Sequence, residues 1–590
     1  MKKHPVVFLV ISFFILLTVA CSKESEEITL TLERAQINFD TPDKQAMDVF
    51  FESNALQITL AIPESDRTWC FATLAENRIT VKVSENISVG AARSTIITVM
   101  AEGLSAPQTI SVTQAASSRY IRSFTIPAGI NNLHTDIKGV IDDKARTITL
   151  TSSEWIGNVK NLIAQFESPG KLFIGEKEQM SGVTPNSFLE KLIYRVKTGD
   201  GQVTEYVLIT RGPMFTGLPV IKVDIDGGAE VVIKDEKLPS TLFLTVPENN
   251  SFDKHATRMT IRGRGNSTWN MPKKPYRIDF PEETSLFGLA KAKKWVLLAN
   301  YQDPTLLMND VAFQLGRLLG LEFNHSSIHV ELFINGTHRG NYQLTEQNEV
   351  GVGRVDIDTN GGFLVEMDTY FDEDYKFVTD HLRLPVMVAE PALNNENEME
   401  YIRVAMQAME DALFETDFPN NAYEEHTDVH SLINYMLINE VVRNQELGHP
   451  KSTYCYKEAD TKIKWGPLWD FDWAFGYNEQ NAYFIKTNLL FYQGNSDARP
   501  GARFFSRLME IPGFRASYKA RWREVRPLVA GITDYIDEKA AKLDQSQALN
   551  FNIPEATPVT RNKSYQQLIN QMKAWLEGRI TFLDAEIDKM

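Results

Sequence analysis

Short stretches in which apolar and polar residues alternate fill the first third of the chain. Residues 56–60, 79–83 and 95–99 each show this period of two, and Asn, Gly and Ser turns separate them. Alternation predicts half-buried β-strands, and many short strands with turns between them are typical of a β-sandwich. A second region with the same pattern, residues 119–211, predicts another all-β unit.

Helical periodicity appears only in the remaining part of the chain. Residues 306–319 carry apolar side chains at helical spacing, and helical patterns dominate beyond residue 400. The last of them, residues 565–589, presents one apolar face, which predicts packing against a core. Strands also occur from residue 218 onward. The predicted fold class is therefore multidomain, with two N-terminal all-β, immunoglobulin-like sandwiches followed by an α+β domain.

Length and composition agree with several folded units. The chain has 590 residues, of which 43% are hydrophobic and 23% are charged, as in globular proteins. The formal net charge of −16 would repel a phosphate backbone, which argues against a nucleic-acid partner. Only three cysteines are present, too few for a disulfide framework or a cysteine-rich zinc site.

The first residues have the pattern of an export signal. Two lysines precede an apolar run over residues 6–20, which is shorter than a comfortable transmembrane helix of about 20 residues. The run ends in Thr-Val-Ala-Cys and resembles a bacterial lipoprotein signal, so we expect a signal over residues 1–21 with a lipid on Cys21. This resemblance implies an outer-membrane or cell-surface protein that contacts the membrane through its lipid anchor only.

A glycine-rich segment, residues 262–269, suits an anionic ligand. Arg262 and Arg264 alternate there with two glycines, which allow close backbone approach, and two hydroxyl residues follow. The alternative is a β-turn that carries surface arginines. Two lysines, Lys273 and Lys274, then enter a predicted strand, where one of them can reach phosphate oxygens or both can guard a sheet edge.

Two carboxylates, Asp470 and Asp472, lie at the end of a predicted apolar strand rich in tryptophan. Buried aspartates are costly unless a cation pairs with them, and Mg²⁺ prefers a few carboxylates together with phosphate oxygens and water. The alternative partners are arginines or helix N-termini. An acidic segment, residues 368–374, lacks the spacing of a calcium-binding loop, and we expect it to be solvated.

Two resemblances to known families follow from longer strings. Trp69, residues 86–99 and residues 109–114 resemble the BACON domain, a bacterial immunoglobulin-like module, over residues 22–117, and residues 118–213 look like a second immunoglobulin-like unit. The name of that module implies a glycan partner, although a sandwich tryptophan such as Trp69 is expected to be buried.

The strings RGRGNSTWNMPKKPYRIDF, KKWVLLANYQDPTLLMNDVAFQLGRLLG, VELFINGTHRGNYQLTEQ and GPLWDFDWAFG resemble the CotH family of atypical protein kinases, so residues 218–590 are expected to form a kinase-like domain that ends in helices. The resemblance implies ATP and Mg²⁺ or Mn²⁺ as cofactors. It makes Asp470 a catalytic and metal-binding residue, with Asp472 sharing the ion. It also implies nucleotide binding by a set of four residues: Arg262, Arg264, Lys274 and Glu346. Lys273 is the alternative to Lys274, and the alternative for Glu346 is a structural role.

The predicted catalytic loop departs from the family pattern. The usual Asn-x-Asp is Asn-Gln-Glu here, which makes Glu446 the candidate catalytic carboxylate, one methylene longer than aspartate. His449 is a second candidate base, and Lys451 can hold a phosphate or pair with Glu446. A displaced catalytic carboxylate lowers the reaction rate, so this departure affects the expected activity and not the expected fold.

Three functions remain open at this stage. The first is an exported lipoprotein kinase that phosphorylates Ser or Thr of an exported or surface protein. The second is an inactive pseudokinase that serves as a surface adhesin or scaffold, which Glu446 favours. The third is a glycan-binding surface lipoprotein, which would rest on the first β unit alone.

Overall fold

The computed structural model describes residues 27–590 except 87, 89–90, 117–119, 134, 153–158, 169, 190, 198–202, 246–255, 477–484 and 554–562. The predicted signal over residues 1–21, including the lipid site at Cys21, lies outside the described residues. No helix among the described residues is long and apolar enough to cross a membrane.

The first unit is a sandwich of two four-stranded sheets, β1-β3-β6-β5 and β2-β8-β7-β4. Trp69 is 7% exposed and packs in the core between the sheets, as predicted for a sandwich tryptophan. The strands are β1 (Leu30–Leu32), β2 (Gln36–Phe39), β3 (Gln45–Ser53), β4 (Ile58–Ala61), β5 (Cys70–Ala75), β6 (Arg78–Val83), β7 (Arg93–Ala101) and β8 (Gln108–Gln114).

The second unit has its own core between a three-stranded sheet, β10-β9-β14, and a six-stranded sheet, β11-β12-β19-β18-β15-β16. Strands β13 and β17 form a separate pair. The elements are β9 (Ser123–Ile126), α1 (Ala128–Asn131), β10 (Ile137–Lys138), β11 (Val140–Asp142), β12 (Thr147–Thr151), β13 (Leu162–Ile163), β14 (Gln165–Glu167), β15 (Lys171–Ile174), β16 (Lys177–Gln179), β17 (Pro185–Asn186), β18 (Ile193–Lys197) and β19 (Val203–Arg211).

The third unit begins with a closed seven-stranded barrel in the order β20-β21-β22-β23-β24-β26-β25. Closure depends on the parallel pairing of β20 with β25, which joins segments far apart in the sequence. Apolar side chains such as Trp295 fill the interior, so the barrel is a packed core. The strands are β20 (Val220–Ile225), β21 (Leu238–Thr245), β22 (Thr257–Gly263), β23 (Tyr276–Thr284), β24 (Ala292–Leu298), β25 (Ser327–Ile334) and β26 (Thr337–Glu346).

A five-stranded sheet, β28-β29-β27-β30-β31, and a set of α-helices complete the described part of the third unit and share one large hydrophobic core. The strands are β27 (Phe363–Met367), β28 (Lys376–Val378), β29 (Pro385–Glu390), β30 (Thr453–Lys457) and β31 (Lys464–Trp465). The helices are α2 (Met308–Leu319), α3 (Glu400–Asp411), α4 (Val429–Val442), α5 (Pro500–Leu508), α6 (Pro512–Ala530), α7 (Ile532–Asn552) and α8 (Tyr565–Asp588).

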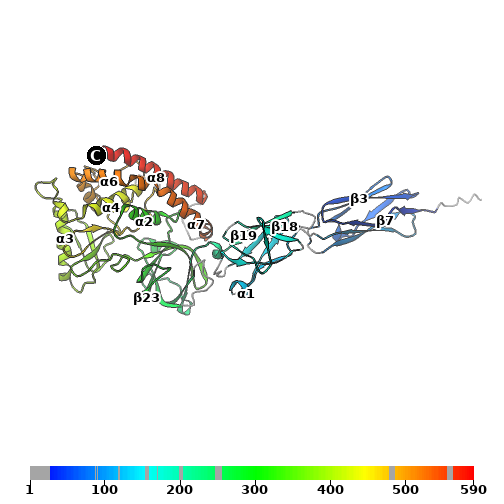
Figure 1. The fold of residues 1–590 in the computed structure, drawn as a ribbon, viewed down its shortest axis with the longest axis horizontal. Helices are drawn as coiled ribbons and strands as arrows, with labels where there is room; N and C mark the ends of the chain where they lie inside the picture. Colours follow the sequence, from blue (N-terminus) through cyan, green and yellow to red (C-terminus); the bar gives the residue numbers. More distant parts are fainter. Residues whose placement is uncertain are drawn as a thin grey trace, which may run out of the picture.

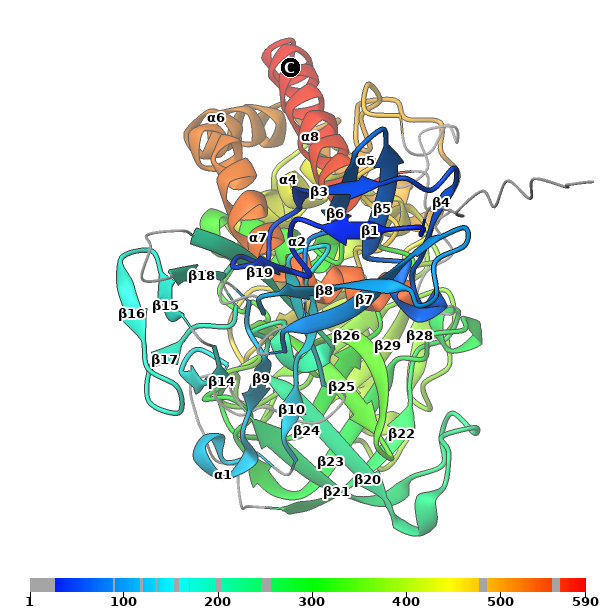
Figure 2. The ribbon, with the colours of Figure 1, turned by 90° about the vertical axis from the view of Figure 1, so that its right-hand side faces the viewer.

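The three units follow one another along the long axis of the molecule (Figure 1). In the view along that axis, the barrel lies below and helices α6 and α8 lie above (Figure 2). Phe215, Val220 and Phe333 join the hydrophobic core of the second unit, although Val220 and Phe333 belong to barrel strands. The second unit and the barrel therefore share buried apolar contacts, which hold them as neighbours.

The predicted order of all-β units followed by an α+β unit is confirmed. The helix predicted over residues 306–319 is α2, and the one predicted over 565–589 is α8, whose Ser564 forms a capping box with Gln567. The Asn335–Gly336 turn joins β25 to β26, because both residues adopt the positive φ that this tight turn requires.

One buried ion pair ties the helices together. Arg579 of α8 pairs with Glu440 of α4, and both side chains are almost fully buried. We expect Arg579→Met to destabilise the third unit by about 3–5 kcal/mol, because it leaves the Glu440 carboxylate buried without a cation. Thermal unfolding measures the change. Arg523→Met, which breaks an exposed ion pair on α6, is the control, and equal melting temperatures for both variants would contradict the role of this pair.

Candidate active site

A polar cavity of about 300 Å³ lies between the barrel and the five-stranded sheet. Its basic lining residues are Lys234, Arg262, Arg264, Lys273, Arg277 and Lys451. Its acidic lining residues are Asp235, Glu366, Asp368, Asp372, Glu373, Glu446, Asp470 and Asp472. Both signs of charge thus converge on one space, an arrangement that suits a polyanion together with a cation.

The glycine-rich segment forms the barrel side of this cavity. Strand β22 ends at Gly263, and the chain turns through Gly265, whose φ is 80°. A Cβ on Gly263 would lie 2.4 Å from the ring of Trp269, so this glycine allows the ring to pack on the backbone. The turn directs Arg264 over the ring of Trp469, 5.4 Å from its centroid, on the wall that carries Asp470.

The segment that carries Asp470 is not a strand, which corrects the prediction. Strand β31 ends at Trp465, because Gly466 has a φ of 130° and Pro467 cannot donate a ladder hydrogen bond. Asp470 itself adopts a φ of 63°, an uncommon backbone conformation that clusters at functional sites. The amide of Phe471 donates to Asn309 Oδ1 over 3.0 Å, which fixes this turn to the first turn of α2.

Glu446 lies on a short 3₁₀ turn, η7 (Gln445–Gly448), which follows α4. The side chain of Asn444 caps this turn by accepting from the amide of Glu446. The Glu446 side chain is 9% exposed, and its Oε2 has no hydrogen-bond partner in the described part of the chain. Lys451 Nζ lies 4.0 Å from Glu446 Oε1, so the lysine is close but does not satisfy Oε2.

Three carboxyl groups repel one another in this cavity. Burial raises the pKa of Asp472 well above its usual value, and Asp470 and Glu446 add to the effect. Burial also raises the pKa of Asp470, against the opposing charge of Arg264. The pKa of Glu446 rises to about 8 through burial and the neighbouring Asp470. These carboxylates therefore lack sufficient positive charge from the protein alone, which is the condition that a bound cation relieves.

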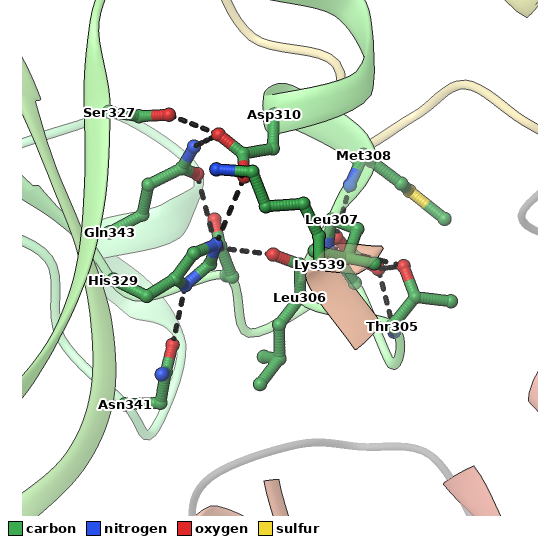
Figure 3. A network of polar contacts seen from close by, with 12 residues as sticks. Thr305, Leu306, Leu307, Met308, Asp310, Ser327, His329, Asn341, Gln343 and Lys539 are labelled. Atoms are coloured by element: carbon green, nitrogen blue, oxygen red, sulfur yellow. Dashed lines mark hydrogen bonds and ion pairs between the residues drawn. The ribbon is translucent and has the colours of Figure 1, made fainter. Parts of the chain in front are cut away.

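A second polar network holds α2 against the barrel and α7 (Figure 3). Asp310 of α2 accepts hydrogen bonds from Ser327 and Gln343 and lies 3.5 Å from Lys539 Nζ of α7. His329 Nε2 lies 3.6 Å from Asp310 Oδ2. Because Asn309 and Asp310 are adjacent, this network positions the residue that anchors Phe471.

The structure does not bring every predicted residue to the cavity. Arg262, Arg264, Glu446, Asp470 and Asp472 all line it. Lys274 does not, since its Nζ donates to the Trp269 carbonyl over 2.7 Å. Lys273 does line the cavity, but its ammonium donates to Ala299 O, Asn341 O and Asn550 Oδ1, so it ties the barrel to α7.

Glu346 also lies outside the cavity. It is 3% exposed, and its Oε2 accepts from the amide of Ser326, which braces the start of β25. The neighbouring Gln347 lines the cavity instead. Side chains alternate across a strand, so a prediction that is one residue out of register selects the wrong face.

The acidic segment is a wall of the cavity, and the prediction of a solvated loop is wrong for its first residue. Asp368 is 6% exposed and accepts from the amides of Tyr370 and Ser452. The sequence did not predict that Asp368 and Glu366 of β27 line the cavity, because it does not show which loops come together. Lys451, whose Nζ lies 4.5 Å from the ring centroid of Tyr370, connects this wall to Glu446.

No group of three or more His, Cys, Asp or Glu side chains is arranged to hold a metal ion by itself among the residues that the structure describes. Asp470 and Asp472 supply two carboxylates on one wall, and Glu446 Oε2 is unpartnered. This donor set fits a Mg²⁺ ion that takes its remaining ligands from phosphate oxygens and water.

The fold and the cavity define an α+β protein with a charged site between a barrel and a sheet. The sequence model of the CotH kinase protein family matches residues 261–583, which include the glycine-rich segment, Glu446 and the two aspartates. The match covers more than half of the chain, so the protein belongs to the CotH kinase protein family. A search of curated proteins finds no match.

Solved structures match the chain only distantly. The ectodomain of human desmocollin-1 has 10% identity and a TM-score of 0.19, and the match covers 43% of this chain and 56% of that one, little over half its length. A structure of three titin immunoglobulin domains has 12% identity and a TM-score of 0.16, with 42% and 92% covered. Likenesses at these TM-scores do not define the fold of the β units.

The raised pKa values predict how stability depends on pH. Burial and Asp368 raise the pKa of Glu366 to about 8, and that of Glu446 also lies near 8. The folded protein therefore holds more protons than the unfolded chain between pH of about 4.5 and 8. We expect the melting temperature of the metal-free protein to fall as pH rises through this window.

Glu366→Gln should flatten this decline, because the amide resembles the protonated carboxyl and does not titrate. The measurement is thermal unfolding in EDTA at a series of pH values. Glu396→Gln, at an exposed position outside the cavity, is the control. A melting temperature that rises across the window would show that the carboxyls are paired rather than crowded.

Proposed function

We propose that this protein transfers the γ-phosphoryl group of ATP to a Ser or Thr hydroxyl of an exported or surface protein, with Mg²⁺ or Mn²⁺ as cofactor. The observation that carries the proposal is the cavity that Arg262, Arg264, Asp470 and Asp472 line together. Arginines recognise phosphate oxygens, and a divalent ion links those oxygens to carboxylates. Membership of the CotH kinase protein family supports the same chemistry.

Each residue of the cavity has a distinct task in this proposal. Asp470 and Asp472 would hold the cation, which neutralises charge on the phosphates when it is bound. Arg264 and Lys451 would bind phosphate oxygens from opposite walls. Glu446 would accept the proton of the acceptor hydroxyl. At the same time the hydroxyl oxygen would bond to the γ-phosphorus, and the bond between that phosphorus and ADP would break.

The environment of Glu446 suits a general base. A pKa of about 8 lies near neutral pH, where a group can both take up and release a proton. Its unpartnered Oε2 is free to accept from a hydroxyl, since no hydrogen bond within the described residues would have to break. The glutamate therefore offers the chemistry that aspartate supplies in the usual family pattern.

We also propose that the two β units serve as a stalk for the CotH domain. They lie in line with it (Figure 1), and Trp69 is buried in a core rather than displayed for a sugar. A lipid on Cys21 at the outer membrane or cell surface would place the stalk between the membrane and the cavity.

Asp470→Asn tests the metal site. Asparagine tolerates the positive φ of this position but lacks the charge, so the fold should persist. We expect Mg²⁺-dependent ATP binding, measured by calorimetry, to weaken about a hundredfold or more. Asp374→Asn, an exposed residue that does not line the cavity, is the matched control. Unchanged ATP binding in a folded Asp470→Asn variant would remove Asp470 from the site.

Glu446→Gln tests the base. We expect it to lower the rate of phosphoryl transfer by about 10²–10⁴ and to leave Mg²⁺-dependent ATP binding intact. The readout is transfer of labelled γ-phosphate to protein, with ATP affinity measured in parallel. Glu446→Asp should retain more activity than the glutamine variant. Full transfer activity in Glu446→Gln would mean that the residue acts only by its length and packing, and would remove it as the base.

A further inference from the structure

A second cavity, of about 570 Å³, lies on the other side of the turn that carries Glu446. Its lining includes Arg443 at the end of α4, Gln445 of η7, Arg499 before α5, and Phe582 of α8. Gln445 lines this cavity, whereas the next residue, Glu446, lines the candidate active site. Adjacent residues of one short turn therefore contact two different cavities.

Arg443 is a buried cation whose guanidinium is only partly satisfied. It is 5% exposed, and its Nε donates to the carbonyl of Asn488 over 3.2 Å. Among the described residues its Nη1 has no hydrogen-bond partner, and Glu440 attracts it without forming an ion pair with it. Burying a charge in this way is costly unless a ligand of opposite charge completes the site.

The carboxylates near Arg443 are each paired with another cation. Arg579 pairs with Glu440, and Arg499 pairs with Asp497 over 2.6 Å. Glu586, the other acidic residue of the lining, pairs with Lys589. Burial, with a smaller contribution from Arg579 and Arg499, lowers the pKa of Arg443 to about 10, and Glu440 only partly opposes this.

Gln445 adds a second donor of the same kind. It is 5% exposed, and its Nε2 has no partner within the described residues. Its backbone carbonyl accepts from Arg499 Nη1 over 3.4 Å, which links the turn to the other arginine of the cavity. Buried donors of native proteins are normally satisfied, so two orphans that line one cavity point to a missing acceptor.

We propose that this cavity binds a phosphate group, either as inorganic phosphate or as a phosphate monoester, through Arg443 and Gln445. A phosphate offers several acceptor oxygens and negative charge, which matches a guanidinium and an amide donor. The bound anion stabilises the turn that carries Glu446. A Cβ on Gly448 would lie 2.7 Å from the Arg499 guanidinium carbon, so turn and cavity wall are in direct contact.

The test uses the full chain without nucleotide and measures phosphate binding by ³¹P NMR, first with inorganic phosphate and then with O-phosphothreonine. Arg443→Met should weaken binding at least tenfold, and Gln445→Leu should weaken it several-fold. Gln445→Leu should leave the melting temperature of the phosphate-free protein unchanged, because it removes an orphan donor. Arg443→Met also loses the hydrogen bond to Asn488, so its phosphate binding is measured on the folded variant, and a purely structural Arg443 would leave that binding unchanged.

Arg264→Met, in the candidate active site, is the matched control, and the binding that depends on Arg443 should survive it. Phosphate should also slow amide hydrogen exchange in the Gln445–Gly448 turn of the wild-type protein. Binding of the ester alone would assign the site to a phosphorylated side chain, and binding of both would assign it to any phosphate. Binding that is lost in Arg264→Met and retained in Arg443→Met would overturn the proposal, as would no binding. These readouts do not require kinase activity.

Discussion

The burial of Glu446, Asp470 and Asp472 together in one cavity is the constraint on which the third unit depends. Three carboxyl groups in one partly buried cavity cost free energy unless protons or cations join them. The fold nevertheless holds all three in place, through the positive φ of Asp470, the amide of Phe471 on Asn309, and the Asn444 cap of the η7 turn. Such arrangements persist where a bound ligand offsets this free-energy cost, and they are typical of functional sites.

The fold of the third unit places the basic residues of the cavity opposite its acidic residues. Closing the barrel fixes the turn after β22, and with it Arg264, beside the segments after α4 and after β31 that carry these carboxylates. Helix α2 joins the two halves, because Asp310 is bound by the barrel and by α7 while Asn309 holds Phe471. The barrel also shares apolar contacts with the second β unit, so these two parts of the chain pack together.

Local pattern predicted the elements well and the cavity in part. The helices α2 and α8 and the β25–β26 turn follow from periodicity and turn chemistry, which are local. Arg262, Arg264 and the two aspartates were found because charge and glycine stand out in apolar surroundings. The choice between Lys273 and Lys274 depends on strand parity and tertiary contacts, and neither lysine proved to have a free ammonium at the cavity.

The remaining misses share one physical cause, which is long-range pairing. Barrel closure joins β20 to β25, and Asp368 accepts a hydrogen bond from the amide of Ser452, which is far from it in the sequence. The orphan Arg443 is likewise visible only once α4, α8 and the segment before α5 are packed together. Sequence periodicity does not show which segments far apart in the sequence come into contact.

The most direct test of the central claim is a crystal structure of the protein with Mn²⁺ and a non-hydrolysable ATP analogue, examined by anomalous scattering. The account predicts a manganese peak between Asp470 and Asp472, with the triphosphate reaching Arg264 from the metal. A triphosphate bound elsewhere, or manganese absent from these two carboxylates at saturating concentration, would contradict it.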